Sequence, residues 1–215
     1  MGITTRIGAL AAETGALLLA ASCAGCEHPG TVLCDSCLGA LAPVPREVRT
    51  TDGLRVRAAL VLDGPAASCI RRLKGAGQTV LARPLGAALA AVLLPALVPG
   101  AWVIPVPTSR AAFRRRGYRV PELLVRRAGV EPQRVLAVTR RVRDQRELPA
   151  AARSDNVRGA MRARRQGHGA PAVLVDDVVT TGATLDESTR ALTAVGFVVV
   201  GAVALAATPS PTESG

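Results

Sequence analysis

The sequence predicts an α/β domain built on a parallel sheet flanked by helices, preceded by a small cysteine-rich module. Segments with the apolar pattern of strands alternate with segments of helical periodicity along most of the 215 residues. The chain is 49% hydrophobic but only 2% aromatic, so Ala, Val and Leu must form the core, as in sheets buried on both faces. We expect a helix and metal module over residues 1–48, one domain over residues 49–207, and a disordered tail over residues 208–215.

The elements of the first two thirds follow from hydrophobic periodicity. Apolar residues between Ile7 and Leu18 fall at helical spacing and predict a short amphipathic helix. The prolines of Pro43–Glu47 indicate a linker into the main domain. The segments predicted next are strand Arg55–Leu62, helices Ala66–Leu73 and Val80–Leu94, strand Ala101–Val106, helix Val120–Arg127 and strand Val135–Val138.

The last third contains the most strongly apolar strand. Before it, the arginine-rich stretch Thr139–Asp155 has little periodicity and indicates a long mobile loop. Ala172–Val175 is a fully apolar strand, Gly182–Val195 a helix and Phe197–Ala206 the closing strand. Strands that alternate with helices imply right-handed parallel crossovers.

Two apolar stretches raise the question of export or of a membrane. The first, from Ile7 to Cys23, follows only one cation, Arg6, and is interrupted by Glu13, which favours a helix over a leader. The second, Leu81–Val98, contains Arg83 and prolines and suits a buried helix. We therefore expect a cytoplasmic protein with no membrane span.

The chain is strongly basic. It has 27 Lys and Arg against 16 Asp and Glu, a formal net charge of +11. This balance indicates an anionic partner, either phosphate esters or nucleic acid. Lys74 is the only lysine of the chain.

Two adjacent carboxylates follow the apolar strand at Asp176 and Asp177. Ligands bind at the carboxyl ends of strands in open α/β sheets. The loop Val178–Thr184 is small and rich in hydroxyls and opens a helix, so its N–H groups and Thr side chains can surround a phosphate. Acids beside such a loop suit a sugar phosphate. The alternative is a strand end with two solvated acids and an N-capping Thr.

The segment VLVDDVVTTGATLDE, Val173–Glu187, closely resembles the phosphoribosyl pyrophosphate (PRPP) signature of type I phosphoribosyltransferases. The resemblance implies a type I phosphoribosyltransferase-like fold, with the acids on the ribose 2′- and 3′-hydroxyls and the loop on the 5′-phosphate. It also implies Mg²⁺, held mainly by substrate oxygens. The expected PRPP-binding residues are Asp176, Asp177, Val178, Thr180, Thr181, Gly182, Ala183, Thr184, Lys74 and Gly75, with Asp176, Asp177 and Lys74 in catalysis.

Over nearly its full length the chain resembles the ComF competence-protein family. The order of motifs carries this resemblance: four cysteines, then Leu73-Lys74, then Pro105-Val106-Pro107 with Arg116-Gly117, then Gln145, Leu148, Arg153, Asn156, Gly159 and Ala160. Two departures concern the site. Tyr118 is followed by Arg119 and Val120 where the family has Asn and Gln, and the stretch before Gln145 is shorter than usual.

The departing pyrophosphate needs cationic or backbone donors. Lys74 and the small residues up to Gly77 can supply both, or can be a surface lysine before a helix-stopping glycine. Arg140, Arg141, Arg143 and Arg146 lie on the predicted loop, which either closes over the site or is a solvated basic segment.

Four cysteines form two pairs with the spacing of zinc knuckles, Cys23 with Cys26 and Cys34 with Cys37. We expect them to hold a structural Zn²⁺, with two disulfides as the alternative. Cys69 is expected to be a buried small hydrophobe. His28 could replace one ligand, but four thiolates already complete the shell.

Two functions compete at this stage. The first is an enzyme that transfers a phosphoribosyl group to an acceptor that the sequence does not identify. The second, implied by the ComF resemblance, is a DNA-uptake protein that binds single-stranded DNA and uses the PRPP site for regulation. A third reading is a fold retained only as a partner surface. The sequence leaves the oligomeric state open.

Overall fold

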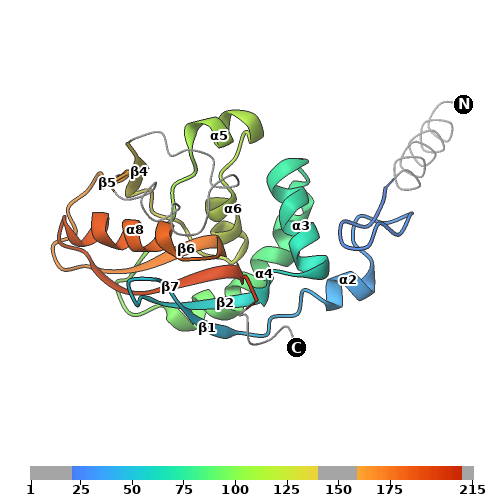
Figure 1. Cartoon of the computed structure of the whole chain (residues 1–215), viewed down its shortest axis with the longest axis horizontal. Helices are drawn as coiled ribbons and strands as arrows, with labels where there is room; N and C mark the ends of the chain where they lie inside the picture. Colours follow the sequence, from blue (N-terminus) through green and yellow to red (C-terminus); the bar gives the residue numbers. More distant parts are fainter. Residues whose placement is uncertain (1–20, 140–158, 210–215) are drawn as a thin grey trace, which may run out of the picture.

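The computed structural model describes residues 21–139 and 159–209. There the chain forms a five-stranded sheet of order β1-β2-β7-β6-β3 with helices on both faces, and a separate two-stranded sheet (Figure 1). This is the mostly parallel α/β architecture that the sequence predicts. The predicted helix at Ile7–Leu18, the arginine-rich loop after Thr139 and the tail after Pro209 lie outside the described residues.

The elements have the following bounds. The first half contains α2 (Asp35–Gly39), β1 (Arg46–Arg49), β2 (Arg55–Val61), α3 (Gly64–Gly75), the 3₁₀ turn Thr79–Leu81, α4 (Ala82–Leu93), the 3₁₀ turn Leu94–Ala96 and β3 (Trp102–Pro105). The second half contains α5 (Arg110–Arg116), α6 (Val120–Arg127), β4 (Leu136–Val138), β5 (Met161–Ala163), β6 (Pro171–Val179), α8 (Ala183–Thr193) and β7 (Val198–Ala207).

The four strands β2, β7, β6 and β3 run parallel and are buried on both faces. Alternate residues of β6 show this most clearly. Val173 and Val175 belong to the core cluster that α3, α4 and α6 complete, and Ala172 and Leu174 belong to the cluster on the α8 side. A strand packed on both faces reads as a continuous apolar run, which is why β6 was easily recognised in the sequence.

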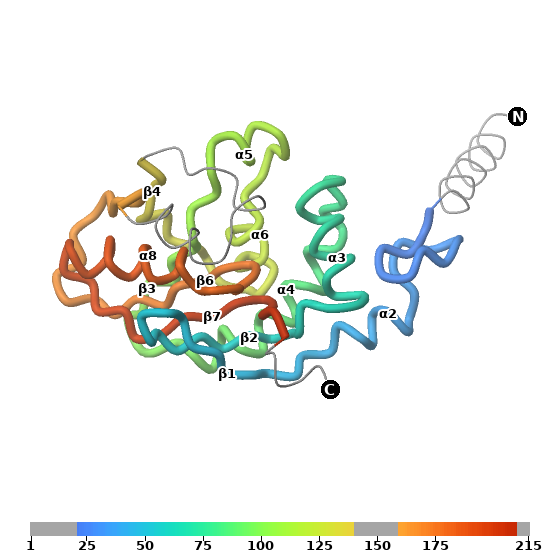
Figure 2. Tube along the Cα trace, viewed as in Figure 1, coloured from blue at the N-terminus to red at the C-terminus, as the bar shows by residue number. Residues whose placement is uncertain are grey.

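The closing strand does not lie at the edge of the sheet. β7 lies between β2 and β6 and pairs in parallel with both (Figure 2). The edges are β3 and the short β1, which is antiparallel to β2. The last strand of the chain is therefore the middle strand of the sheet.

Among the differences from the expected elements, three concern the strands at the edges of the fold and an exposed helix. β1 begins at Arg46, inside the predicted linker Pro43–Glu47. The helix α5 was not predicted, because none of its residues is buried and periodicity cannot reveal it. β4 leaves the main sheet and pairs antiparallel with β5, also unpredicted.

The apolar segment Thr79–Ala96 is long and apolar enough, by length and composition alone, to cross a membrane. Within it, α4 packs against the sheet and α6, with Leu85, Leu89 and Val92 fully buried. Gly86 permits this approach, because a Cβ there would lie 2.3 Å from Arg127 Cβ. The segment thus packs as the buried helix that the sequence predicts.

Candidate functional site

The two acids of the predicted phosphate segment lie inside β6, near its carboxyl end. The strand was expected to stop at Val175, but it continues to Val179 because its residues from Asp176 onward pair with β7. On the other side, β3 ends at Pro105, opposite Val175. Strand pairing on that side therefore stops just before Asp176 and Asp177, and such strand ends are where ligands bind in parallel sheets.

Lys74 lies beside these acids. It occupies the last turn of α3, and its Nζ donates to Asp177 Oδ1 at 2.7 Å. The Lys74 side chain is 25% exposed and that of Asp177 13%, so the pair is partly shielded from water. The cation predicted to serve the same ligand as the acids is therefore in contact with one of them.

Asp176 is buried, and the following backbone amide fixes its carboxyl group. The N–H of Asp177 donates to Asp176 Oδ1 at 2.7 Å. Burial, followed by the negative charge of Asp177, raises the pKa of Asp176 to about 8, against the opposite effects of Lys74 and the amide. The Asp176 carboxyl therefore keeps its proton to a higher pH than an ordinary carboxyl does.

The predicted phosphate loop is the turn Thr180–Gly182 together with the start of α8. The helix begins at Ala183, one residue later than expected, with Gly182 as its N-cap at φ 78°. No N-cap side chain satisfies the first N–H groups of α8, apart from a long 3.4 Å contact between Ala183 N and Thr181 Oγ1. Free N–H groups at a helix start, with the helix dipole behind them, form a site for an anion.

The turn between β1 and β2 makes hydrogen bonds to this loop and to the start of α8. The sequence did not reveal this role. Thr51 Oγ1 donates to the carbonyl of Thr181 at 3.4 Å, and Asp52 N donates to Asp186 Oδ2 in the first turn of α8 at 3.3 Å. These contacts join residues 130 and 134 positions apart. The only local signal was the Asp52-Gly53 pair, which is typical of a tight hairpin turn.

Gly182 is required at the contact between this hairpin and the loop. A Cβ there would lie 2.3 Å from Thr50 Cγ2, and the positive φ is itself strained for any other residue. We expect Gly182→Ala to lower the free energy of unfolding by about 2–4 kcal/mol, from backbone strain plus overpacking. Urea unfolding monitored by circular dichroism measures it.

The matched control is Gly53→Ala in the facing turn. Gly53 also has a positive φ, 85°, but no atom lies within 4 Å of its added Cβ. We expect Gly53→Ala to lower the free energy of unfolding by the strain alone, about 1–2 kcal/mol. Equal losses in the two variants would show that the contact between Thr50 and Gly182 does not matter.

Comparison with protein families decides what this fold is. The family model described as phosphoribosyl transferase domain matches residues 87–214, more than half of the chain. The chain belongs to this phosphoribosyltransferase family. The match includes β6, the phosphate loop and α8, whereas Lys74 and the cysteine segment precede it.

Solved structures give weaker likenesses to this chain. UMP synthase of Leishmania donovani is 18% identical with a TM-score of 0.39, over 80% of this chain and 31% of that one. Orotate phosphoribosyltransferase of Aeropyrum pernix is 19% identical with a TM-score of 0.36, over 79% and 77%. Adenine phosphoribosyltransferase of Rhodothermus marinus is 16% identical with a TM-score of 0.36, over 79% and 85%. No curated protein matches the chain.

In this phosphoribosyltransferase domain, Tyr118 secures the end of α3 that carries Lys74. Its hydroxyl donates to the carbonyl of Leu73, the residue before Lys74. Burial raises the pKa of Tyr118, so the phenol stays a donor. The predicted loop at Lys74 starts later than expected, because α3 runs through Gly75. Beyond it, Gly77 turns the chain at φ 69°.

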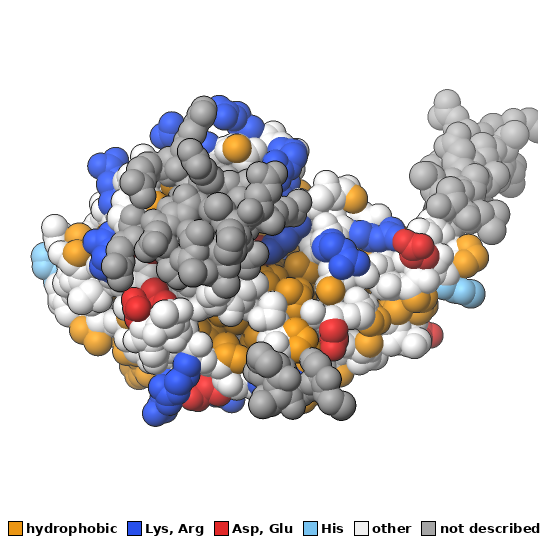
Figure 3. Space-filling model, viewed as in Figure 1, with side chains coloured by type: hydrophobic (Ala, Val, Ile, Leu, Met, Phe, Trp, Pro, Cys, Tyr) orange, Lys and Arg blue, Asp and Glu red, His pale blue; other side chains and the backbone are white. Residues whose placement is uncertain are grey.

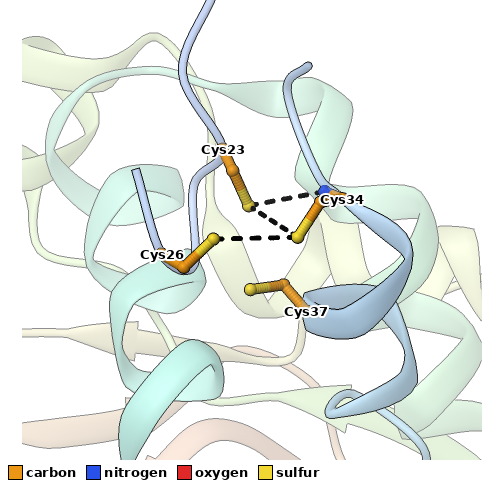
Figure 4. Close-up of side chains that lie close together, drawn as sticks. All are labelled: Cys23, Cys26, Cys34 and Cys37. Atoms are coloured by element: carbon orange, nitrogen blue, oxygen red, sulfur yellow. Dashed lines mark hydrogen bonds between the residues drawn. The ribbon is translucent and has the colours of Figure 1, made fainter. Parts of the chain in front are cut away.

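The four cysteines ahead of the phosphoribosyltransferase domain converge on one point (Figure 4). All their Sγ atoms lie within 4.8 Å of one another, and Cys34 Sγ is 3.6 Å from that of Cys23 and 3.7 Å from that of Cys26. Four thiolates at 2.3 Å from a tetrahedral Zn²⁺ would be about 3.8 Å apart. All four cysteines are free, so the structure favours the metal site over the two-disulfide alternative.

The local chain conformation supports the same conclusion. The N–H groups of Gly25 and Cys34 each point at Cys23 Sγ, 3.4 Å away. Burial alone would raise the pKa of Cys23, but these donors outweigh it and lower the pKa to about 6. Burial and the neighbouring thiols raise the pKa of Cys37, as expected where several thiolates would crowd together without a cation. The residues therefore fit a divalent metal with thiolate ligands.

The cysteine module packs on α3. A Cβ on Gly25 would lie 2.5 Å from Cys37 Sγ and 3.1 Å from Pro65 Cβ in the first turn of α3. Further along the helix, Glu27 pairs with Arg72 at 3.2 Å. His28 is exposed and is not a member of the cluster. Cys69 is fully buried on α3, as predicted.

Several predicted features fall outside the described residues. These are the loop arginines Arg140, Arg141, Arg143 and Arg146 and the motif residues Gln145, Leu148, Arg153 and Asn156.

Proposed function

We propose that this phosphoribosyltransferase binds PRPP with Mg²⁺ and transfers its phosphoribosyl group to an acceptor. One observation carries the proposal: Asp176 and Asp177 lie at an open strand end beside the unsatisfied N–H groups of α8. The carboxyl groups are suited to the ribose hydroxyls, and the turn Thr180–Gly182 with the start of α8 to the 5′-phosphate. The ribose hydroxyls and the 5′-phosphate would thus be bound by adjacent segments of the chain.

Lys74 and Gly75 are suited to the pyrophosphate. In the transfer, the bond between C1 and the pyrophosphate oxygen breaks, a bond from C1 to the acceptor forms, and the acceptor loses a proton. Lys74 would leave its ion pair with Asp177 and pair with the pyrophosphate as negative charge builds on the leaving group. Mg²⁺, held mainly by substrate oxygens, would neutralise the remaining charge.

The test is PRPP binding and turnover in the Asp177→Asn variant. Asp177 offers its carboxylate to both the ribose and Lys74, so its amide should bind PRPP at least tenfold more weakly. Calorimetry in magnesium buffer measures binding, and release of pyrophosphate with pools of nucleobases measures turnover. Full-strength binding by Asp177→Asn would contradict the proposed site.

The control for this variant is Asp63→Asn, which removes one exposed carboxylate at the start of α3. It makes no side-chain capping hydrogen bond, so its loss should leave PRPP affinity and stability unchanged. A loss equal to that of Asp177→Asn would mean that net charge, not the site, governs binding.

Tyr118 should act on the ligand only through α3. Removing its hydroxyl frees the Leu73 carbonyl and loosens the turn that carries Lys74. We expect Tyr118→Phe to weaken PRPP binding about fivefold, the equivalent of one hydrogen bond of about 1 kcal/mol. Calorimetry checks this, with zinc content as a second readout that should stay constant. Unchanged affinity would show that Lys74 is positioned without Tyr118.

A second candidate function is DNA uptake, for which the basic charge is the specific support. The net charge is +11, and Figure 3 shows Lys and Arg side chains gathered over α5, whose sequence includes four arginines. We propose membership of the ComF branch on the four-cysteine module and the motif order. Single-stranded DNA binding that is salt-sensitive and survives Asp177→Asn, without turnover, would favour this function.

Free thiols at a metal site suit the reducing cytoplasm.

A further inference from the structure

A cavity of about 330 Å³ lies away from the proposed PRPP site. Trp102, the first residue of β3, lines it and pairs with Ala172 near the start of β6. Asp177 is five residues further along β6, roughly 16 Å away at about 3.3 Å per residue. The cavity therefore belongs to the opposite end of the sheet and goes beyond the proposed function.

Three arginines and a single acid line this cavity: Arg126, Arg134, Arg165 and Glu131. Two of the guanidinium groups are fixed by carboxylates. Arg134 meets the buried Glu122 at 2.6 Å, and Arg126 meets Glu131 at 3.1 Å. Glu131 is 74% exposed, so an anion with more charge can replace it at Arg126. Each guanidinium keeps further donors, because a carboxylate occupies only part of its fork.

The third guanidinium lies against the only tryptophan of the chain. The Arg165 guanidinium carbon is 5.9 Å from the centre of the Trp102 ring, which also packs edge-on with Phe197 at 5.5 Å between ring centres. Among the described residues Arg165 meets no carboxylate. Its charge is therefore available to a ligand, and any ligand that draws it away changes the surroundings of Trp102.

The wall between these arginines is rigid. Gln133 is bonded to Val103 twice, by its side-chain oxygen at 2.6 Å and by its backbone N–H at 2.8 Å. The N–H of Arg164 donates to the carbonyl of Val135 at 2.9 Å, which fixes the segment carrying Arg165. The backbone that carries these arginines is thus held in place.

We propose that this cavity binds the phosphate groups of a phosphorylated ligand. A guanidinium fork matches phosphate oxygens bidentately, and three forks around a lining with one acid favour a dianion or polyanion. The size suits a small ligand. The phosphates come either from a free polyphosphate or nucleotide, or from a nucleic acid backbone, and the chemistry recognised is the same in both cases.

Because Trp102 is the only tryptophan, its fluorescence reports binding directly. Full-length, zinc-loaded protein is titrated at low salt with inorganic pyrophosphate in one arm and with a thymidine oligonucleotide in the other, and each titration is repeated with saturating PRPP and Mg²⁺. We expect a saturable change in emission in at least one arm. The arm with the tighter binding identifies the source of the phosphates.

The variants Arg165→Gln and Arg126→Gln should weaken that response about tenfold each, the loss of one charge-assisted contact. Arg164→Gln removes the same charge next to the cavity without touching its lining, and should change affinity less than twofold. The proposal is overturned if no emission change occurs in either arm, if all three variants lose affinity equally, or if saturating PRPP abolishes a response that Arg165→Gln leaves intact. In the last case the probes report the PRPP site, whose own binding would stand.

Discussion

Cys34→Ser is expected to lose the zinc ion and to lower the melting temperature of the whole chain. Cys34 Sγ lies next to two other cysteine sulfurs, so its loss would leave the metal with only three thiolate ligands of a tetrahedral four. Structural zinc contributes about 10–16 kcal/mol to folding of small modules, although the main domain has its own core. We expect zinc per chain to fall from one to near zero, and the melting temperature to fall by roughly 5–10 °C. Metal analysis and calorimetric unfolding measure the two changes.

The control is His28→Ala, which changes an exposed side chain beside the knuckle and should keep both zinc and stability. Two treatments separate the metal from disulfides. A chelator should reproduce the Cys34→Ser result, and a reductant alone should do nothing. The opposite pattern would establish disulfides and reject zinc.

The loss of zinc should also reach the PRPP site through α3. The module contacts α3 at Pro65 and Arg72, and Lys74 is two residues beyond Arg72. Twelve helical residues span about 18 Å, so a shift at the start of α3 is carried to its end. We therefore expect PRPP affinity to fall several-fold in Cys34→Ser. Unchanged affinity would mean that Tyr118 alone holds Lys74 in place.

What the sequence could predict depended on local signals. The strands β2 and β6 and the helices α4 and α8 were found because each carries its own hydrophobic pattern. Zinc-knuckle spacing and the phosphate segment are equally local. In both, the residue types and their spacing alone indicate the chemistry.

What it could not predict depended on tertiary contacts. β1 is charged, with alternate residues exposed, and exists as a strand only because β2 pairs with it. The central place of β7 follows from pairing order, which periodicity does not encode. In the site, Thr51 and Thr181 are 130 positions apart, so no local pattern could have joined them. Lys74 and Asp177 are 103 positions apart, and only the family resemblance assigned them to the same ligand.

The second large effect concerns Asp176, which is proposed to bind PRPP. We expect this buried acid to lower the stability of the ligand-free protein. Its pKa is raised to about 8 by burial and by Asp177, whereas an unfolded Asp titrates near 3.9. Between these values the folded chain keeps a proton that the unfolded chain has lost. The free energy of unfolding therefore falls as pH rises from about 4 to about 8, by up to about 1.4 kcal/mol per pH unit, and levels off above it.

Asp176→Asn removes this dependence, because an amide does not ionise. We expect the variant to be more stable than the wild type at pH 7.5, by up to about 5 kcal/mol, with a gap that widens between pH 5 and pH 8. The difference between the two proteins isolates Asp176 from the other titrating groups. Urea unfolding over this range measures it, with Asp63→Asn as the neutral control.

The same variant should lose the stabilisation that PRPP gives. In the wild type, PRPP at a hundredfold excess over its dissociation constant adds about 2.7 kcal/mol. Ribose hydroxyls and Mg²⁺ favour the ionised carboxylate, so wild-type affinity should rise with pH up to about 8 and the amide should not follow. A gain in stability together with a loss of ligand binding is the signature of a strained functional group. An Asp176→Asn protein that is less stable at pH 8, or still stabilised by PRPP, would show that this buried acid is structural.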